Sequence, residues 1–182
     1  MLRRTAMAAA LALMLSGTGL TAAERKDVQI FNDVAREVIL YPRFTVFDDI
    51  TGSVDHGVVT LRGKVTMPFK ATEIGLRASK IAGVRQVRNE ISVLPVSFFD
   101  DDLRYRIARA IYGNPTFWHY AAMANPPIHI VVERGHVTLT GVVNSNVERV
   151  LANSLAASSA AFSVQNELKT DAEMQAIMAK LE

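Results

Sequence analysis

The same pattern of residues occurs twice in this 182-residue sequence, and the repeat constrains the fold more than any other feature. Residues 57–65 read GVVTLRGKV and residues 135–143 read GHVTLTGVV, at an offset of 78 residues. Residues 87–91 match residues 164–168 at an offset of 77, and residues 35–44 match residues 108–117 at an offset of 73. Three separated matches in the same order indicate an internal duplication. The change in offset places about five additional residues between the first helix and the first strand of the second copy.

Each copy has the apolar spacing of a helix, two strands, a second helix and a last strand. Helical spacing predicts first helices that end before Pro42 and before Pro115. Alternating apolar residues predict strands over residues 44–50, 59–65 and 87–93 of the first copy, and over 128–132 and 137–143 of the second. The chain is therefore predicted to be α+β, a tandem repeat of two α-β-β-α-β domains. Each domain would have a three-stranded mixed sheet with two helices on one face.

Local signals mark the second helix of each copy. Ser145 stands three residues before Glu148, as in a capping box, and Gly83 is placed to end the helix of the first copy. The residues predicted to form the buried helix faces are Val28, Phe31, Val34, Ala35 and Val38; Ile74, Ala78 and Ile81; Leu103, Ile107, Ala110 and Ile111; and Val147, Val150, Leu151 and Leu155.

A glycine recurs in the middle of the second strand of each copy, at Gly63 and Gly141. Glycine weakens a strand unless another backbone or a ligand approaches closely at that point. We expect the second helix to cross tightly over these glycines. Contact with a ligand is the alternative interpretation.

The repeated residues resemble the BON domain (bacterial osmotic-stress and nodulation domain), present twice between about residues 27 and 170. The motif residues that carry the resemblance are Gly57, Gly63 and Asn89 in the first copy and Gly135, Gly141 and Asn166 in the second. The second copy departs from the pattern at Ser159-Ala160-Ala161, where the first has Ala82-Gly83-Val84, so we expect a differently built turn there. The resemblance implies a protein similar to the periplasmic dual-BON proteins, which associate with phospholipid surfaces or support envelope integrity, and it implies no catalytic residues.

The N-terminus has the pattern of a secretory signal. Arg3 and Arg4 precede the apolar run of residues 6–15, and Thr21-Ala22-Ala23 forms a small-x-small cleavage site. The run is shorter than the ~20 residues that span a bilayer, and a buried N-terminal helix is the alternative. We expect a periplasmic protein with a signal peptide over residues 1–23 cleaved near Ala23, BON domains over 24–97 and 98–170, and a C-terminal amphipathic helix over 171–182.

Composition argues against several functional classes. The chain has no cysteine, which excludes disulfides and a lipid attached to a cysteine at the cleavage site. Removal of Arg3 and Arg4 with the signal leaves equal numbers of basic and acidic residues, so no nucleic-acid partner is expected. No later segment has the length and apolarity of a transmembrane helix.

No residue pattern predicts catalysis. The four histidines have no metal-binding spacing, and no Gly-x-Ser-x-Gly, HExxH or phosphate-loop motif occurs. Asp100, Asp101 and Asp102 precede a helix, where acidic residues favour the N-terminal dipole; a cation site is the alternative. We expect no enzyme activity, no cofactor and no metal.

The candidate binding surface lies in the second copy. Trp118, Tyr120 and Met123 surround the extra residues, and amphipathic aromatic side chains suit a membrane interface. Arg104, Arg106 and Arg109 on the preceding helix would meet anionic headgroups, each contributing ~1 kcal/mol. Alternatively, the aromatic residues cover a sheet edge or the contact between copies; Phe117 aligns with Phe44 and is expected in the core.

The C-terminal segment has a capping box at Thr170 and Glu173. Its apolar stripe consists of Met174, Ile177, Met178 and Leu181. Such a short helix should dock on its own domain or on a partner. Three functions remain open: binding of a phospholipid surface, a chaperone-like interaction with envelope proteins, and binding of a small ion or solute. The sequence leaves the oligomeric state open.

Overall fold

The computed structural model describes residues 26–179, so the predicted signal peptide and Leu181 lie outside the described residues. The first domain consists of α1 (Asp27–Ile39), β1 (Asp49–Asp55), β2 (Val58–Val65), α2 (Pro68–Ser79) and β3 (Gln86–Val93). The second consists of α3 (Phe98–Tyr112), η1 (Pro115–Phe117), α4 (Trp118–Ala121), β4 (Ile128–Glu133), β5 (His136–Val143), α5 (Asn146–Ala157), β6 (Ser163–Asn166) and β7 (Lys169–Thr170), followed by α6 (Asp171–Met178).

The two sheets have the same topology. In each, a first strand pairs antiparallel with the central strand, which pairs parallel with the last. The registers correspond as well, since Leu61 lies opposite Asn89 and Leu139 lies opposite Asn166. The last strand of the second domain is divided, and β7 continues beside β5. The predicted tandem repeat of two α-β-β-α-β units is confirmed.

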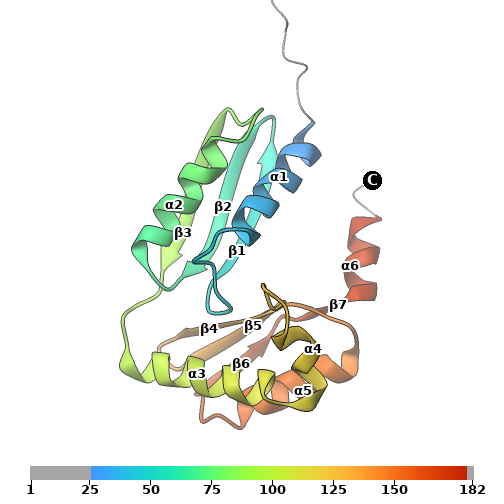
Figure 1. Cartoon of the computed structure of the whole chain (residues 1–182). Coiled ribbons are helices and arrows are strands. Elements are labelled where there is room, and N and C mark those ends of the chain that lie inside the picture. Colours follow the sequence, from blue (N-terminus) through green and yellow to red (C-terminus); the bar gives the residue numbers. More distant parts are fainter. Residues whose placement is uncertain (1–25, 180–182) are drawn as a thin grey trace, which may run out of the picture.

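The two main helices of each domain lie on one face of its sheet. In Figure 1, α1 and α2 lie side by side in front of the first sheet, whereas the second sheet lies between the first domain and helices α3 and α5. Each domain encloses its own apolar core, one formed around Ile30, Leu61 and Ile74 and the other around Ile107 and Leu139. No helix within residues 26–179 is long and apolar enough to cross a bilayer.

Two predicted helix faces are rotated from their observed positions. In α1, Val28 and Phe31 are exposed and Ile30 is buried instead. In α5, Val147 and Val150 are exposed, and the residues buried against the sheet are Ala152 and Ala156, with Leu151 and Leu155 packing beside them. Alanines allow α5 to lie close to the strands, and they occupy the positions that Ile74 and Ala78 hold in α2.

The predicted strand over residues 44–50 is wrong in its first half, because β1 begins at Asp49. Residues 43–48 form a loop that is folded around the buried carboxylate of Asp48. That carboxylate accepts hydrogen bonds from the Thr45 N–H and hydroxyl at 2.9 and 2.8 Å. It also accepts them from the Thr66 N–H at 2.8 Å and from the Lys70 ammonium at 2.6 Å. These bonds give the loop a defined shape.

The same loop joins the two domains. The Val46 carbonyl accepts a hydrogen bond from the Ile130 N–H of β4 at 2.7 Å. Phe47 packs against the core of the second domain and meets Tyr105 edge-on, with 5.2 Å between ring centroids. A second contact is the ion pair between Lys64 of β2 and Glu133 of β4. The first domain therefore rests end-on on the second sheet.

The strand glycines are required by a neighbouring backbone, but that of the preceding segment rather than of a helix. Gly63 and Gly141 have φ of 130° and 112°. A Cβ at these positions would overlap the carbonyl oxygens of Asp49 and Pro127, respectively. Close backbone approach was thus predicted, but the approaching element was wrongly identified.

The hairpin turn of each domain is held by an aspartate of the first helix. Asp27 accepts from the N–H groups of His56 and Gly57, at 2.7 and 2.9 Å. Asp100 accepts from Arg134 and Gly135 in the same way, at 2.8 and 2.7 Å. Gly57 and Gly135 adopt φ of 76° and 79°, which glycine tolerates without strain.

The helix-to-strand turn is built alike in both domains, contrary to prediction. Ala160 takes a φ of 60° where Gly83 takes 91°. The next strand then starts with equivalent hydrogen bonds, from the Arg85 N–H to Gly57 at 2.8 Å and from the Phe162 N–H to Gly135 at 2.9 Å. The alanine accepts a left-handed conformation because the surrounding framework fixes the turn.

Candidate functional site

Two of the predicted surface residues are structural. The Arg104 side chain is buried: it pairs with Asp101 and donates to the Val132 carbonyl at 2.6 Å. Tyr120 is also buried and donates to Glu148 at 2.8 Å. Burial, together with this carboxylate, raises the pKa of Tyr120 to about 12. Neither side chain is placed to meet a lipid headgroup, because each satisfies a polar group within the second domain.

Of the remaining predicted residues, Trp118, Met123 and Arg109 reach the surface around the C-terminal end of α3, whereas Arg106 lies in the middle of the helix. Trp118 is 61% exposed, and its indole N–H donates to the Gly113 carbonyl at 3.2 Å. Met123 and Arg109 are exposed as well. The guanidinium of Arg106 already has partners within the second domain: it pairs with Asp102 and donates to the Ser159 carbonyl at 3.0 Å. Phe117 lies in the core, as expected.

The most exposed aromatic residues gather at the opposite end of α3. Phe98 is 93% exposed and Phe162 is 73% exposed. Phe99 stacks on Phe162 with 5.7 Å between ring centroids. We refer to Phe98, Phe99 and Phe162 as the aromatic cluster. A cluster of exposed apolar rings of this kind marks an interaction surface.

Sequence reasoning overlooked the aromatic cluster, although a signal was present. Ser97 caps α3, accepting from the Asp100 N–H at 3.2 Å, so Phe98 and Phe99 occupy its first turn. Two adjacent helical residues cannot both face the core, and Phe162 replaces Arg85 of the first copy. At least one of the two phenylalanines at the start of α3 must therefore be exposed, and Phe162 places an aromatic ring where the first copy has an arginine.

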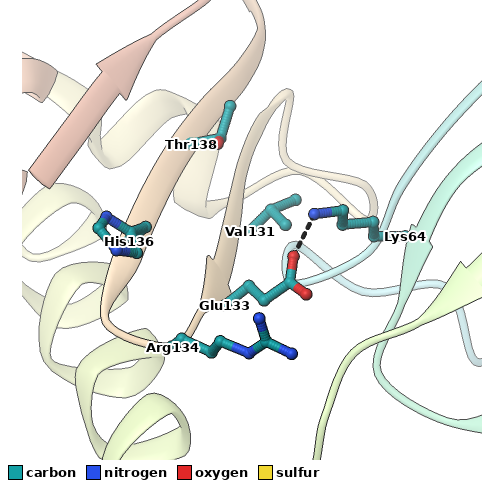
Figure 2. Close-up of a pocket in the computed structure, with 6 residues that line it drawn as sticks. All are labelled: Lys64, Val131, Glu133, Arg134, His136 and Thr138. Carbon is teal, nitrogen blue, oxygen red and sulfur yellow. Dashed lines mark hydrogen bonds and ion pairs between the residues drawn. The ribbon is translucent and has the colours of Figure 1, made fainter.

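Beside the cluster, an open pocket of about 260 Å³ lies on the outer face of the second sheet (Figure 2). Its lining residues are Lys64, Val131, Glu133, Arg134, His136 and Thr138. Lys64 reaches in from the first domain to pair with Glu133. Figure 2 shows the Lys64 ammonium and the Arg134 guanidinium on the two sides of the Glu133 carboxylate.

One residue connects the pocket to the aromatic cluster. His136 lines the pocket, and its ring meets Phe162 edge-on at 6.1 Å. Its Nδ1 lies 2.7 Å from the Ser163 hydroxyl. The second domain therefore presents exposed aromatic rings directly beside a pocket that contains two cationic side chains.

The polar groups of the described chain do not assemble into a metal site. Within residues 26–179, no three His, Asp or Glu side chains are placed to share an ion. Of the three acids considered as a cation site, Asp100 holds the hairpin turn, and Asp101 and Asp102 pair with arginines. Each acid thus has an internal partner.

His129 lies at the contact between the domains. Its ring is 5.3 Å from that of Phe44, between ring centroids. Burial lowers the pKa of His129, although the charge of Asp49 opposes the shift. The neutral form is therefore favoured at this contact.

The C-terminal helix α6 contacts its own domain. The predicted capping box is present: Thr170 accepts from the Glu173 N–H and Glu173 accepts from the Thr170 N–H. Glu173 also pairs with Arg149 of α5 at 2.9 Å. Ile177 remains exposed beside an open groove of about 590 Å³ between α6 and the end of the sheet.

Comparison with known proteins gives one family assignment. The family model described as "BON domain" matches residues 26–95 and again residues 100–172. No curated protein matches the sequence. Two solved structures with similarity come from CdsD, described as a structural protein of the type III secretion system of Chlamydia trachomatis.

The first of these structures shares 13% identity, covers 85% of this chain and 97% of its own, and has a TM-score of 0.25. The second, the C-terminal domain of CdsD, shares 13% identity, covers 79% of this chain and 98% of its own, and has a TM-score of 0.28.

Proposed function

This chain belongs to the BON domain family, and from that premise we propose that it is a non-catalytic protein of the bacterial envelope that binds anionic phospholipid surfaces. The observation that carries the proposal is the aromatic cluster on the second domain. Rings held in water at Phe98 and Phe162 lose apolar exposure when they enter a membrane interface.

The energetics favour reversible binding. Full burial of a phenylalanine side chain contributes about 1.5–3 kcal/mol, and an interface buries it only in part. Each basic residue near an anionic leaflet adds about 1 kcal/mol. Two exposed rings with Arg134 close by thus supply a modest affinity that salt would weaken.

The predicted surface around Trp118 offers a second contact region. Since α3 has 15 residues, its two ends are about 22 Å apart, so Trp118 and the aromatic cluster are separate contacts. Arg109 and Met123 accompany Trp118. Variants at each end show which region meets the membrane.

Vesicle co-sedimentation tests the proposal. Without its signal segment, the protein should sediment with phosphatidylglycerol vesicles at low salt, and less with phosphatidylcholine vesicles. The pair Phe98→Ser and Phe162→Ser should lower binding about tenfold or more. The matched control is Val147→Ser with Val150→Ser, which removes exposed apolar side chains from α5. A comparable loss in the control, or no sedimentation of the unaltered protein, would contradict the proposal.

The second contact region is tested by Trp118→Ala with Arg109→Ala in the same assay. A loss as large as that of the phenylalanine pair would assign the membrane contact to both ends of α3. Unchanged binding would restrict the contact to the aromatic cluster.

The proposed compartment is the periplasm, reached by the predicted signal. Intact-mass measurement of the protein recovered from the cell envelope should show cleavage after Ala23. Recovery of the uncleaved chain from the cytoplasm would contradict this part of the proposal.

A chaperone-like interaction with envelope proteins is the second candidate function. It is favoured by the open groove beside α6, where Ile177 is exposed. If the groove holds client segments, the protein should suppress aggregation of a model client without lipid, and deletion of residues 171–182 should abolish the effect.

A further inference from the structure

We propose that the pocket between the two domains binds a phosphate group, carried by a phospholipid headgroup or free in solution. The headgroup form rests on the proposed membrane binding, whereas the free form does not. The pocket is the one shown in Figure 2, on the outer face of β4 and β5.

The first observation that supports the proposal is the environment of the Arg134 guanidinium. The backbone N–H of Arg134 is bound to Asp100, whereas its guanidinium has no hydrogen-bond or ion-pair partner among residues 26–179. Arg134 sits in the tight turn with a φ of 54°, so its backbone is held in place. A guanidinium on a fixed backbone is well suited to bidentate binding of phosphate oxygens.

The second support is a cation that a ligand can recruit. Lys64 pairs with Glu133, and both side chains are partly exposed to solvent. Exposed ion pairs contribute little to stability, so an incoming phosphate can draw Lys64 away from Glu133 at small cost. Glu133 is then an internal competitor that offsets part of the positive charge of the empty pocket.

Three further side chains complete the lining. The hydroxyl of Thr138 can donate to an oxygen, and the Nε2 of His136 remains available because its Nδ1 lies against Ser163. Val131 lies opposite Thr138 on the neighbouring strand β4 and provides an apolar patch, and Phe162 of the aromatic cluster contacts the ring of His136. A headgroup phosphate in the pocket would therefore place its carbon chain beside exposed aromatic rings.

The first domain lacks the corresponding site. Its equivalents of Glu133 and Arg134 are Asp55 and His56, which contact each other at 2.7 Å. Lys64 itself comes from the first domain, so the pocket exists only where the two domains meet. One site per chain is expected.

The test is a titration of the protein with inorganic phosphate at constant ionic strength, followed by amide ¹H–¹⁵N chemical shifts. Saturable shifts are expected at residues 133–138. Arg134→Asn should weaken binding about tenfold, since asparagine tolerates the left-handed backbone while removing a charge-assisted contact. Glu133→Gln should strengthen binding, because it removes the competitor.

Arg36→Ala is the matched control, since it removes an exposed arginine from α1 of the first domain and should leave phosphate binding unchanged. Lys64→Met removes the other cationic side chain of the pocket. The proposal is overturned if the shifts do not saturate, or if Arg134→Asn and Lys64→Met bind phosphate like the unaltered protein.

Phosphatidylglycerol vesicles distinguish the two sources of phosphate. If the ligand is a headgroup, Arg134→Asn lowers vesicle binding and inorganic phosphate competes with vesicles. If the ligand is free phosphate, the same variant loses phosphate binding but sediments normally. Saturable phosphate binding by a protein that never sediments would refute the membrane proposal and leave the pocket established.

Discussion

The two domains satisfy the same backbone group by different chemistry. In the first, the Thr66 N–H after the central strand donates to the buried carboxylate of Asp48, which precedes β1. In the second, the equivalent Asn144 N–H donates at 2.8 Å to the Tyr120 hydroxyl and at 3.0 Å to Glu148 on α5. The fold requires an acceptor at this point and tolerates an acceptor from either side.

The two acceptors have different surroundings. Asp48 is fully buried and pairs with Lys70, which is only 5% exposed. Burial alone would raise the pKa of Asp48, but the hydrogen bonds from Lys70, Thr66 and Thr45 together hold it below its ordinary value. In the second domain the position of Lys70 is taken by Glu148, and a tyrosine hydroxyl replaces the cation as its partner.

The difference between the two acceptors corresponds to different roles of the segment between the first helix and the first strand. In the first domain, the loop around Asp48 is short and docks on β4 through Val46 and Phe47. In the second, the longer segment forms η1 and α4, and places Phe117 and Tyr120 over its own core. The segment between the first helix and the first strand therefore joins the two domains in the first copy, whereas in the second copy it covers the core of its own domain.

The largest expected effect is that of Asp48→Ala. Removing one partner of a buried ion pair leaves Lys70 uncompensated, which should lower the free energy of unfolding by about 3–5 kcal/mol. Denaturant unfolding measures the loss, and hydrogen exchange should place it in the first domain. Asp48→Leu with Lys70→Met should be less destabilising than Asp48→Ala. A loss below about 1 kcal/mol would mean that the buried pair is not structural.

The next effect concerns a feature that both domains share. Asn89 donates to the Ala71 carbonyl at 2.7 Å, and Asn166 donates to the Arg149 carbonyl at 2.9 Å. Asn89→Ala and Asn166→Ala should therefore have similar costs, about 1–2 kcal/mol each, in separate unfolding measurements. Clearly unequal losses would show that the motif asparagine has different roles in the two domains.

A smaller effect is expected for Tyr120→Phe. The substitution removes one acceptor, but Glu148 continues to bind the Asn144 N–H, so the loss should be about 1 kcal/mol. Thermal or denaturant unfolding gives the value. If the loss equals that of Asp48→Ala, the two networks are equivalent despite their different chemistry.

The smallest effect is a pH dependence of the contact between domains. Because burial lowers the pKa of His129, the unfolded chain binds its proton more readily than the folded one. Its stabilising contribution is therefore complete above the ordinary histidine pKa of about 6.5 and declines as the pH falls below that value. The lowered pKa of Asp48 acts in the same direction, but only below about pH 4.

Unfolding free energies at several pH values check this expectation. The unaltered protein should lose stability between about pH 7 and pH 5, and His129→Gln should show a shallower dependence over that interval. The first domain has Thr51 at the equivalent position, so it supplies no such dependence. Equal slopes for the two proteins would remove His129 as the cause.

The repeat predicted the fold because its residues determine strand register directly. Gly63, Leu61 and Asn89 each recur at the same place in both sheets. The burial of Ala152 and Ala156 could also have been found, by transferring the α2 pattern at an offset of 78. The start of β1 could not, because it depends on hydrogen bonds that Asp48 makes with distant residues.

The candidate site was only partly predictable for a similar reason. The burial of Arg104 depends on a carbonyl of β4, and that of Tyr120 on a carboxylate of α5. The pocket combines Lys64 with residues 67 or more positions away, which no local pattern joins. The spacing of residues along one helix identifies side chains that are neighbours on that helix. It does not identify the groups on other elements to which those side chains bind.

The bond between Val46 and Ile130 has a consequence for the independence of the second domain. β4 is an outer strand, and its backbone would present unpaired groups without the loop of the first domain. An uncovered outer strand readily pairs with other chains and promotes aggregation. A fragment that begins at residue 98 would expose this strand together with the apolar surface that Phe47 covers. We therefore expect the first domain to protect the second from aggregation by covering this outer strand.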